Sequence, residues 1–286
     1  MNVLLSKPIG YCYGVTNAIN IAKNIKNKHQ DKNVYIFGLL IHNKEIIPYL
    51  ESFGIKTIHT SNIDIEDRLN KFTSDDVVVF TAHGHKKHYE EILRNNNVTF
   101  YDAVCPRVQD NINLILNAKQ DIIYIGKSNH PEAEVCKSLS DKLYFYDIKD
   151  GFDFNIKLNK PLVLNQTTMS FIEIKHIHDE ILSHYKDAEI HNEICDASRL
   201  RQENINFIPN ECDLIVVVGD KKSSNSNKLY EVALSLHKDK LVLFVETYKD
   251  LSKYDLKGYK NAFITSGTST PMNLVNEVKE FLEDSK

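Results

Sequence analysis

Short apolar runs recur along the chain, and each of them ends in polar or small residues. The clearest are residues 34–38, 77–81, 122–126 and 214–219, which are rich in valine, isoleucine and aromatic residues. Apolar runs of this length, bounded by turn-forming residues, predict buried strands. Similar runs predict further strands at residues 3–6, 55–59, 98–101, 143–146, 161–165, 188–191, 240–245 and 262–265.

Segments with apolar residues three or four positions apart lie between these runs. The clearest is residues 171–185, where this spacing predicts an amphipathic helix. Strands that alternate with helices predict an α/β protein with mostly parallel sheets. The other helices are expected at residues 15–28, 44–53, 85–96, 107–119, 131–139, 199–207, 228–236 and 272–282.

Three of the five cysteines divide the chain into similar thirds. Cys12 and Cys105 are 93 positions apart, Cys105 and Cys195 are 90 apart, and 91 residues follow Cys195. Each of the three follows a predicted strand and stands among turn-forming or polar residues. Cys136 and Cys212 instead lie in apolar patterns that are typical of buried thiols. The even spacing predicts a repeat of whole α/β units.

The predicted units are residues 13–104, residues 105–194, and residues 195–286 together with residues 1–12. The third unit takes its last strand from the N-terminus, because no strand follows its final helix. In α/β folds, ligands bind where the strands have their carboxyl ends. We therefore expect three similar domains with pseudo-threefold symmetry, with the cysteines at the centre and polar loops around them.

Polar residues that can bind an anion stand at these strand ends. The loops contain His42, His83 and His130, the segment 223–225 (Ser-Ser-Asn) before a helix, and Ser269 before another helix. Helix N-termini with hydroxyl and amide donors bind anions, although each of these residues alone is an ordinary N-cap or a structural histidine. The chain lacks a phosphate-binding Walker loop and a dinucleotide glycine pattern. The loops therefore predict a substrate phosphate rather than a bound nucleotide.

The segment His130-Pro131-Glu132 begins a predicted helix directly after a strand. Proline favours the first helical position, so Glu132 falls in the first turn. Taken alone, Glu132 would only complement the positive end of the helix dipole. Its place beside a strand-end histidine also makes it a candidate proton source.

Composition and charge narrow the possible functions. The 286 residues carry a net charge of −4 and are 42% hydrophobic and 26% charged, which is typical of a globular protein. Neither a nucleic-acid partner nor a membrane partner is expected, and without a signal peptide or a membrane-length apolar run we expect a cytoplasmic protein. No C-x-x-C pair occurs, so three convergent cysteines could bind zinc, an iron–sulfur cluster or no metal.

An ordered set of motifs resembles the 4-hydroxy-3-methylbut-2-enyl diphosphate reductase family. Each motif is weak alone, but the set is specific and extends over nearly the whole chain. Tyr11 and Tyr13 stand where the family commonly has Phe and Ala, and Ser198 stands where threonine is usual. The motifs are Gly10-Tyr11-Cys12-Tyr13-Gly14-Val15, Ile41-His42-Asn43, Ala82-His83-Gly84, Asp102-Ala103-Val104-Cys105-Pro106, Gly126 to Glu132, Gln166-Thr167-Thr168, Ile194-Cys195, Ser223-Ser224-Asn225-Ser226-Asn227 and Gly267 to Pro271.

The resemblance implies an enzyme of isoprenoid synthesis in the methylerythritol phosphate pathway. Such an enzyme removes the allylic hydroxyl of its substrate with two electrons and two protons, giving isopentenyl and dimethylallyl diphosphates and water. Ferredoxin or flavodoxin would supply the electrons, and we expect a monomer.

The resemblance also implies the roles of particular residues. Cys12, Cys105 and Cys195 would hold one 4Fe-4S cluster with one open iron. Glu132 would deliver a proton, and Thr167 would orient the substrate hydroxyl. The diphosphate would be bound by His42, His83, His130, Thr168, Ser223, Ser224, Asn225 and Ser269.

Two other classes of protein are compatible with part of the pattern. A non-catalytic iron–sulfur sensor would explain the cysteines, but not Glu132, Thr167 and the serine loops. A metal-dependent phosphohydrolase would use the histidines, but few carboxylates lie near His42 and His83 in the sequence.

Overall fold

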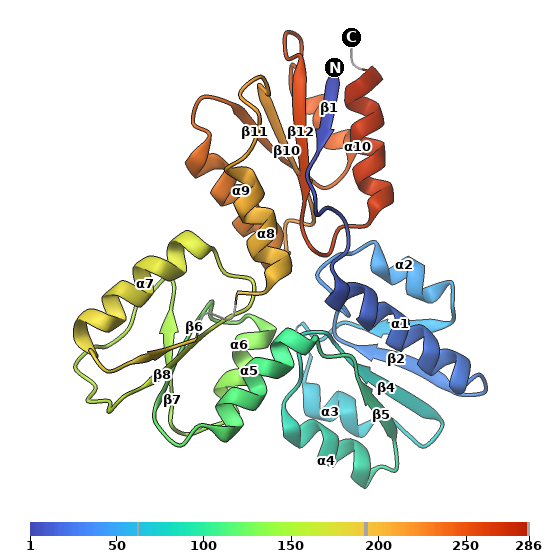
Figure 1. Cartoon of the computed structure of the whole chain (residues 1–286). Coiled ribbons are helices and arrows are strands. Elements are labelled where there is room, and N and C mark those ends of the chain that lie inside the picture. The colour runs from blue at the N-terminus through green and yellow to red at the C-terminus, as the bar shows by residue number, and fades with distance from the viewer. Residues whose placement is uncertain (62, 192–193, 285–286) are drawn as a thin grey trace. The chain divides into compact units, whose positions relative to one another are not determined.

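The computed structural model describes residues 1–61, 63–191 and 194–284 (Figure 1). Residue 62 of the first predicted unit, residues 192–193 of the second and residues 285–286 of the third lie outside the described residues. Within the described chain, twelve strands form three four-stranded sheets in which all neighbouring strands are parallel. The predicted α/β class with parallel sheets is confirmed.

The first sheet has the strand order β3-β2-β4-β5. Its strands are β2 (Asn33–Phe37), β3 (Ile55–Ile58), β4 (Asp76–Phe80) and β5 (Thr99–Asp102). The helices of this part of the chain are α1 (Tyr13–Lys28), α2 (Ile46–Glu51), α3 (Ile65–Asn70) and α4 (Lys87–Asn95). Aromatic and aliphatic side chains from α3, α4, β2 and β4 form one core cluster on this sheet.

The second sheet has the order β7-β6-β8-β9. Its strands are β6 (Ile122–Gly126), β7 (Leu143–Asp147), β8 (Leu162–Asn165) and β9 (Glu189–Ile190), and its helices are α5 (Pro106–Asn117), α6 (Pro131–Lys137) and α7 (Phe171–His184). All five residues of β6 are buried, as its apolar sequence predicts for a strand covered on both faces.

The third sheet has the order β1-β12-β10-β11. It contains β1 (Asn2–Leu5), β10 (Leu214–Val218), β11 (Leu241–Val245) and β12 (Asn261–Ser266), with helices α8 (Asp196–Ile205), α9 (Ser224–Leu236), the 3-10 helix η1 (Tyr248–Lys253) and α10 (Met272–Asp284). The N-terminal strand β1 lies beside β12, with Asn2 opposite Asn261. All three sheets therefore share one plan, in which β1 takes the place that β5 and β9 have in the other two sheets.

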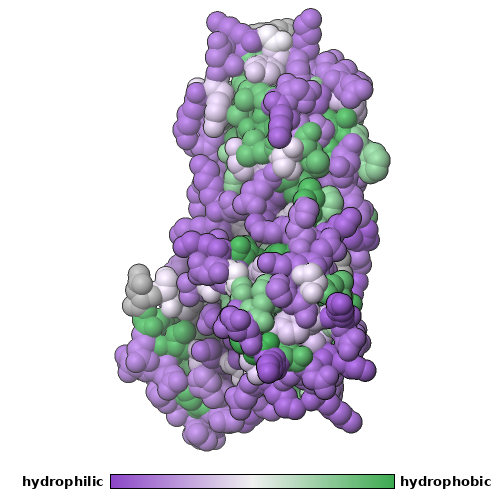
Figure 2. All heavy atoms as spheres, turned by 90° about the vertical axis from the view of Figure 1, so that its left-hand side faces the viewer, coloured by the Kyte–Doolittle hydropathy of each residue, from purple (hydrophilic) through white to green (hydrophobic). Residues whose placement is uncertain are grey.

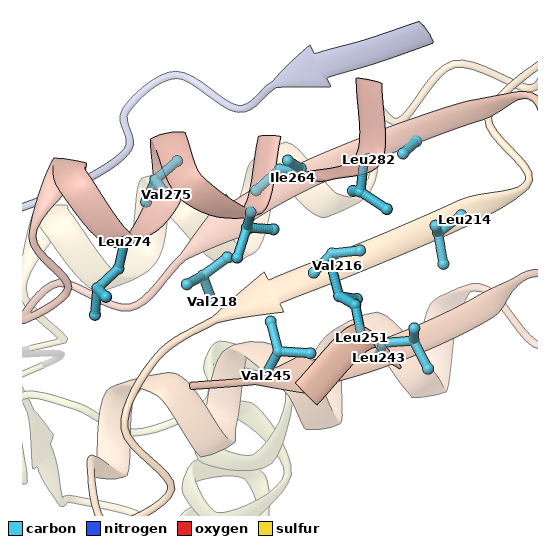
Figure 3. Packing of buried hydrophobic residues seen from close by; sticks show 12 residues of the cluster. Leu214, Val216, Val218, Leu243, Val245, Leu251, Ile264, Leu274, Val275 and Leu282 are labelled. Carbon is cyan, nitrogen blue, oxygen red and sulfur yellow. The ribbon is translucent and has the colours of Figure 1, made fainter. Parts of the chain in front are cut away.

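Helices cover both faces of the third sheet, and β10 shows why. Its residues alternate between the faces, as expected for a strand. Val216 packs with side chains of α10 and η1, as the close view in Figure 3 shows. Val217 instead belongs to the cluster with α8 and α9. The continuous apolar run of β10 thus fills two cores.

Tertiary packing groups the described chain into two compact units. Compact unit 1 contains the third sheet and comprises Met1–Tyr13, Thr167–His176 and Ile194–Lys286. Compact unit 2 contains the other two sheets and comprises Gly14–Gln166 and Ile177–Glu193. The division into three domains at residues 104 and 194 stays a prediction.

The polarity of the surface agrees with the large share of charged and polar residues in the sequence. On the face drawn in Figure 2, most side chains are hydrophilic, and hydrophobic side chains appear in small patches between them. Among the helices of the described residues, none is long and apolar enough to cross a membrane.

Candidate active site

Three cysteines occupy equivalent places, each between the end of a sheet's edge strand and the start of a helix. Cys105 and Cys195 are the N-cap residues of α5 and α8, and Cys12 directly precedes α1. The backbone N–H of each donates a 3.0 Å hydrogen bond to a carbonyl two residues beyond the strand that pairs with β1, β5 or β9: Cys12 to Thr268 after β12, Cys105 to Ala82 after β4, and Cys195 to Thr167 after β8. The repeat expected from the spacing therefore extends to the local backbone geometry.

The surroundings of the cysteines separate them into two groups. Cys12, Cys105 and Cys195 are partly exposed, whereas Cys136 and Cys212 are buried. Burial raises the pKa of Cys136 to about 12, and it also raises the pKa of Cys212. The positive end of a helix favours thiolates and an anionic cluster. The three cysteines at helix starts thus fit an iron–sulfur cluster, and the two buried thiols do not.

In compact unit 1, a hydrogen-bond network links the loops of two cysteines. The Sγ of Cys195 lies 3.0 Å from the hydroxyl of Ser198, which accepts a 2.7 Å bond from Nδ2 of Asn225. The Oδ1 of Asn225 accepts a 2.8 Å bond from the N–H of Thr268. The carbonyl of Thr268 in turn accepts the bond from the backbone N–H of Cys12. Asn225, predicted to bind the diphosphate, therefore also connects these two loops.

A buried arginine supports the same two loops. Arg201 on α8 is 1% exposed and donates to the carbonyl oxygens of Gly10, at 2.7 Å, and Ala197, at 2.8 Å. Burial lowers the pKa of Arg201, while the nearby Cys12 and Cys195 raise it. Arg201 thereby holds the chain before Cys12 against the helix that begins after Cys195. The sequence pattern does not reveal this role, because an arginine inside a helical pattern usually lies in solvent.

Five of the predicted diphosphate ligands lie in compact unit 1, and four of them pair through their hydroxyl groups. Ser223 caps α9 by accepting a 3.4 Å bond from the N–H of Ser226. Ser269 donates to the Ser223 hydroxyl at 3.5 Å. Thr168 donates to Ser224 at 3.1 Å. The N-terminus of α9 is thus surrounded by hydroxyl groups, as the sequence predicts for an anion-binding loop.

Two glycines allow α9 to begin directly against the ends of the strands. A Cβ atom at Gly219, after β10, would lie 2.4 Å from the Oγ of Ser226. A Cβ at Gly267, after β12, would lie 2.0 Å from the same atom. Any side chain at either position would push the helix away from the sheet, so these positions require glycine.

In compact unit 2, three histidines from different strand ends converge. The rings of His42 and His83 have centroids 4.5 Å apart, and that of His130 lies 5.7 Å from His42 and 5.6 Å from His83. Their ligand atoms all lie within 4.8 Å of one another, a set that could also hold a metal ion. The sequence prediction that these residues belong to one anion site agrees with their convergence.

Two of the three histidines, His83 and His130, are neutral near pH 7. Burial, and then the neighbouring His42, lower the pKa of His83 well below 6.5 and that of His130 to about 3. The Nδ1 of His130 accepts a 3.3 Å bond from the N–H of Glu132, so we assign the ring proton of the neutral form to Nε2. Among the described residues, the buried Nε2 atoms of His83 and His130 have no hydrogen-bond partner. A bound anion would give the Nε2–H of His130 an acceptor.

These shifted histidines predict a pH-dependent stability. In the unfolded chain His130 titrates near 6.5, while burial and His42 hold its folded pKa at about 3. Below about pH 6.5 the unfolded state binds a proton that the folded state does not, so the free energy of unfolding falls as the pH falls. His130→Asn keeps an N-cap acceptor but does not titrate. The free energy of unfolding of each apoprotein is measured with urea at several pH values. Between about pH 6 and pH 4.5, it should fall less steeply with falling pH in the variant than in the wild type, by roughly 1 kcal/mol per pH unit.

The exposed His176 provides the matched control. His176→Asn should leave the pH slope of wild-type unfolding unchanged. Parallel unfolding curves for wild type and His130→Asn would contradict the assignment of a buried neutral imidazole at His130.

Glu132 lies in the first turn of α6, as predicted, and it is 1% exposed. The Tyr124 hydroxyl donates to its Oε1 at 3.2 Å, and Nδ2 of Asn111 reaches the same oxygen at 3.5 Å. No sequence motif marks Tyr124 or Asn111 as a functional residue. Thr167, the other predicted catalytic residue, is buried in compact unit 1, and its carbonyl binds the N–H of Cys195.

These features define a class: an α/β protein with three parallel sheets, a cysteine at a helix start for each, and histidine and hydroxyl donors suited to an anion. The chain belongs to the LytB protein family, whose model matches residues 3–283.

Relatives with a named activity cover nearly the whole chain. The 4-hydroxy-3-methylbut-2-enyl diphosphate reductase of Brevibacillus brevis is 36% identical over 296 residues, which is 99% of this chain and 92% of that protein. The enzyme of the same name from Bacillus subtilis is 37% identical over 290 residues, with 99% and 91% covered. The family resemblance inferred from the motifs is confirmed.

Solved structures support the fold. The structure of the E-1-hydroxy-2-methyl-but-2-enyl-4-diphosphate reductase from Plasmodium falciparum matches with a TM-score of 0.82 and 27% identity, covering 99% of this chain and 87% of that one. A structure of (E)-4-hydroxy-3-methyl-but-2-enyl diphosphate reductase matches with a TM-score of 0.67 and 24% identity, covering 99% of each chain. None of these relatives is named as a sensor or a phosphohydrolase.

Proposed function

We propose that this chain reduces 4-hydroxy-3-methylbut-2-enyl diphosphate to isopentenyl and dimethylallyl diphosphates. Two electrons and two protons replace the allylic C–O bond by a C–H bond and release the oxygen as water. The observation that carries the proposal is a buried carboxyl group, Glu132, at the start of a helix whose N-cap, the neutral His130, belongs to a cluster of three histidines. Such a group can supply a proton next to an anion site, and the family membership names the substrate.

We assign Cys12, Cys105 and Cys195 as the three protein ligands of one 4Fe-4S cluster, with one iron left without a protein ligand. Their partial exposure and their repeated place before a helix support this choice over Cys136 and Cys212. When bound, such a cluster supplies electrons, and its open iron supplies a Lewis acid.

Several residues around the diphosphate act as neutral donors. The neutral imidazole of His130 donates through Nε2, and the serine and threonine hydroxyls at the start of α9 donate beside the positive helix end. Because these donors add no net charge, binding holds the substrate by directed hydrogen bonds. The proposed diphosphate ligands are His42, His83, His130, Thr168, Ser223, Ser224, Asn225 and Ser269.

Two residues act at the hydroxyl group that leaves. Glu132 holds the proton that the departing oxygen receives, and burial keeps bulk water away from its carboxyl group. Thr167 orients the substrate hydroxyl through its own hydroxyl. We also propose that a ferredoxin or flavodoxin donates the electrons and that the protein is a cytoplasmic monomer. Its three domains would be residues 13–104, residues 105–194, and residues 195–286 together with residues 1–12.

An anaerobic assay tests the activity. The reconstituted protein, a reduced low-potential dye and the hydroxylated diphosphate should give both products and oxidise two equivalents of one-electron dye per substrate. The same mixture without dye is the control. Release of inorganic phosphate without reductant would favour a phosphohydrolase, and a stable cluster without turnover would favour a sensor. Iron and sulfide near zero after reconstitution would contradict the cluster.

A further inference from the structure

Tyr124 brings a hydroxyl group against Glu132 from a neighbouring element. Tyr124 lies in β6, is fully buried, and packs its ring in a core cluster with residues of α5, α6 and β8. Its hydroxyl lies 3.2 Å from the Oε1 of Glu132. A hydroxyl in such a core costs free energy unless it has a partner. A phenylalanine would fill the same space, so the feature that tyrosine adds is its hydroxyl, which bonds to Glu132 and also interacts with Cys136.

A second donor approaches the same carboxyl oxygen. The Nδ2 of Asn111 on α5 lies 3.5 Å from the Oε1 of Glu132 and donates to the carbonyl of Asn165 at 3.0 Å. The bond to the Asn165 carbonyl, at the end of β8, holds the side-chain amide of Asn111 in place. The backbone of β8 therefore sets the direction in which this amide points toward Oε1. A protonated carboxyl group has one acceptor oxygen and one hydroxyl oxygen. Both described donors meet Oε1, so this oxygen serves as an acceptor.

The titratable groups with described contacts to Glu132 are neutral near pH 7. Burial and Glu132 raise the pKa of Tyr124 well above 10. Burial and Glu132 raise the pKa of Cys136, one helical turn after Glu132 and interacting with the same hydroxyl, to about 12. His130, which accepts from the Glu132 N–H, has a pKa of about 3. Tyr124 therefore keeps its proton and remains a permanent donor.

We propose that Tyr124 is a positioning residue for the reaction, which holds the Oε1 of Glu132 as an acceptor and thereby fixes the orientation of the carboxyl group that delivers the proton. This inference rests on the role of Glu132 proposed above. Without the Tyr124 hydroxyl, the carboxyl group can rotate, and its proton is no longer fixed on one oxygen. The hydroxyl also stabilises the ionised carboxylate, so its loss should extend the protonated form to higher pH.

Infrared spectroscopy of the holoenzyme tests the bond without turnover. The difference between wild type and Glu132→Gln isolates the carboxyl band of Glu132. The difference between Tyr124→Phe and the double variant isolates the same band without the hydroxyl. The band should move to higher frequency in Tyr124→Phe, because its C=O loses a hydrogen bond. It should also disappear at a pH about 0.5–1 unit higher than in the wild type.

Turnover provides the second readout. Tyr124→Phe should lower kcat about tenfold with KM nearly unchanged, and the decline of activity at high pH should move upward. In the Glu132→Gln background the same substitution should have little further effect, because Tyr124 acts through Glu132. The control is Tyr185→Phe, which removes another hydrogen-bonded tyrosine hydroxyl, one that is partly buried and donates to the Ile156 carbonyl at 2.6 Å. It should change neither the band nor kcat.

Each outcome decides the proposal. An unchanged carboxyl band in Tyr124→Phe, or an equal loss of kcat in the Glu132→Gln background, overturns it. A band shift in a protein without reductase activity would support the positioning role and sink the proposed function alone. If Tyr124→Phe does not fold, Asn111→Leu removes the weaker donor to Oε1. It should then move the band in the same direction by less, and an unmoved band would count against the proposal.

Discussion

Glu132→Gln is expected to retain the cluster and substrate binding while losing about 10²–10⁴-fold in turnover. Glutamine has nearly the same shape as glutamate, and its Oε1 can still accept from the Tyr124 hydroxyl. Its amide cannot release a proton to a departing oxygen. The loss should therefore appear in kcat, because the substitution removes an interaction that operates in the transition state.

The matched control is Glu134→Gln, two residues further along the first turn of α6. Glu134 is partly exposed and pairs with Lys137 on the same helix, so its substitution tests the helix without touching the buried carboxyl. It should keep wild-type turnover. Iron content, the KM for the diphosphate and kcat are measured for both variants. Full activity in Glu132→Gln would refute its role as the proton donor.

The pattern of apolar residues was sufficient to predict most of the helices and strands. The helix predicted at residues 171–185 is Phe171–His184, and the run at residues 122–126 is strand β6. The pattern missed α3 and η1, which have only six residues each and depend on caps rather than on apolar spacing. Asp64 accepts from the N–H of Asp67 at the start of α3. The start of α8 was predicted three residues late, because Cys195 serves as its N-cap.

The site residues that could be predicted from the sequence are polar residues in loops, where such side chains stand out from the apolar runs. His42, His83 and His130 stand outside apolar runs, and the structure brings them together. Tyr124 and Arg201 could not be recognised in this way. Tyr124 is an aromatic residue in an apolar strand, which is also the pattern of an ordinary core residue.

Contacts between different elements of the fold explain these omissions. The hydroxyl of Tyr124 gains its role from a carboxyl group on the following helix. Arg201 binds the carbonyl of Gly10, 191 positions away. No local pattern marks such pairs, because only the folded chain places them in contact.

Cys12→Ser is expected to lose the cluster or to hold it only loosely, and with it most of the reductase activity. A serine hydroxyl is a much poorer ligand for iron than a thiolate. The fold should survive, because the bond from residue 12 to the carbonyl of Thr268 comes from the backbone N–H and does not need the thiol. Cys105→Ser and Cys195→Ser should behave alike, since their N–H groups make the same bond at the same place before a helix.

Iron and sulfide per chain after anaerobic reconstitution provide the measurement, with circular dichroism as the check on folding. Cys212→Ser and Cys136→Ser are the controls, because both thiols are buried and burial keeps them protonated. A buried neutral thiol cannot bind iron without first losing its proton, so both controls should retain wild-type iron even if the core is weakened. Loss of iron in Cys136→Ser together with a full cluster in Cys12→Ser would reverse the ligand assignment. The proposal would then need a cluster site within the core of α6 rather than at the helix starts.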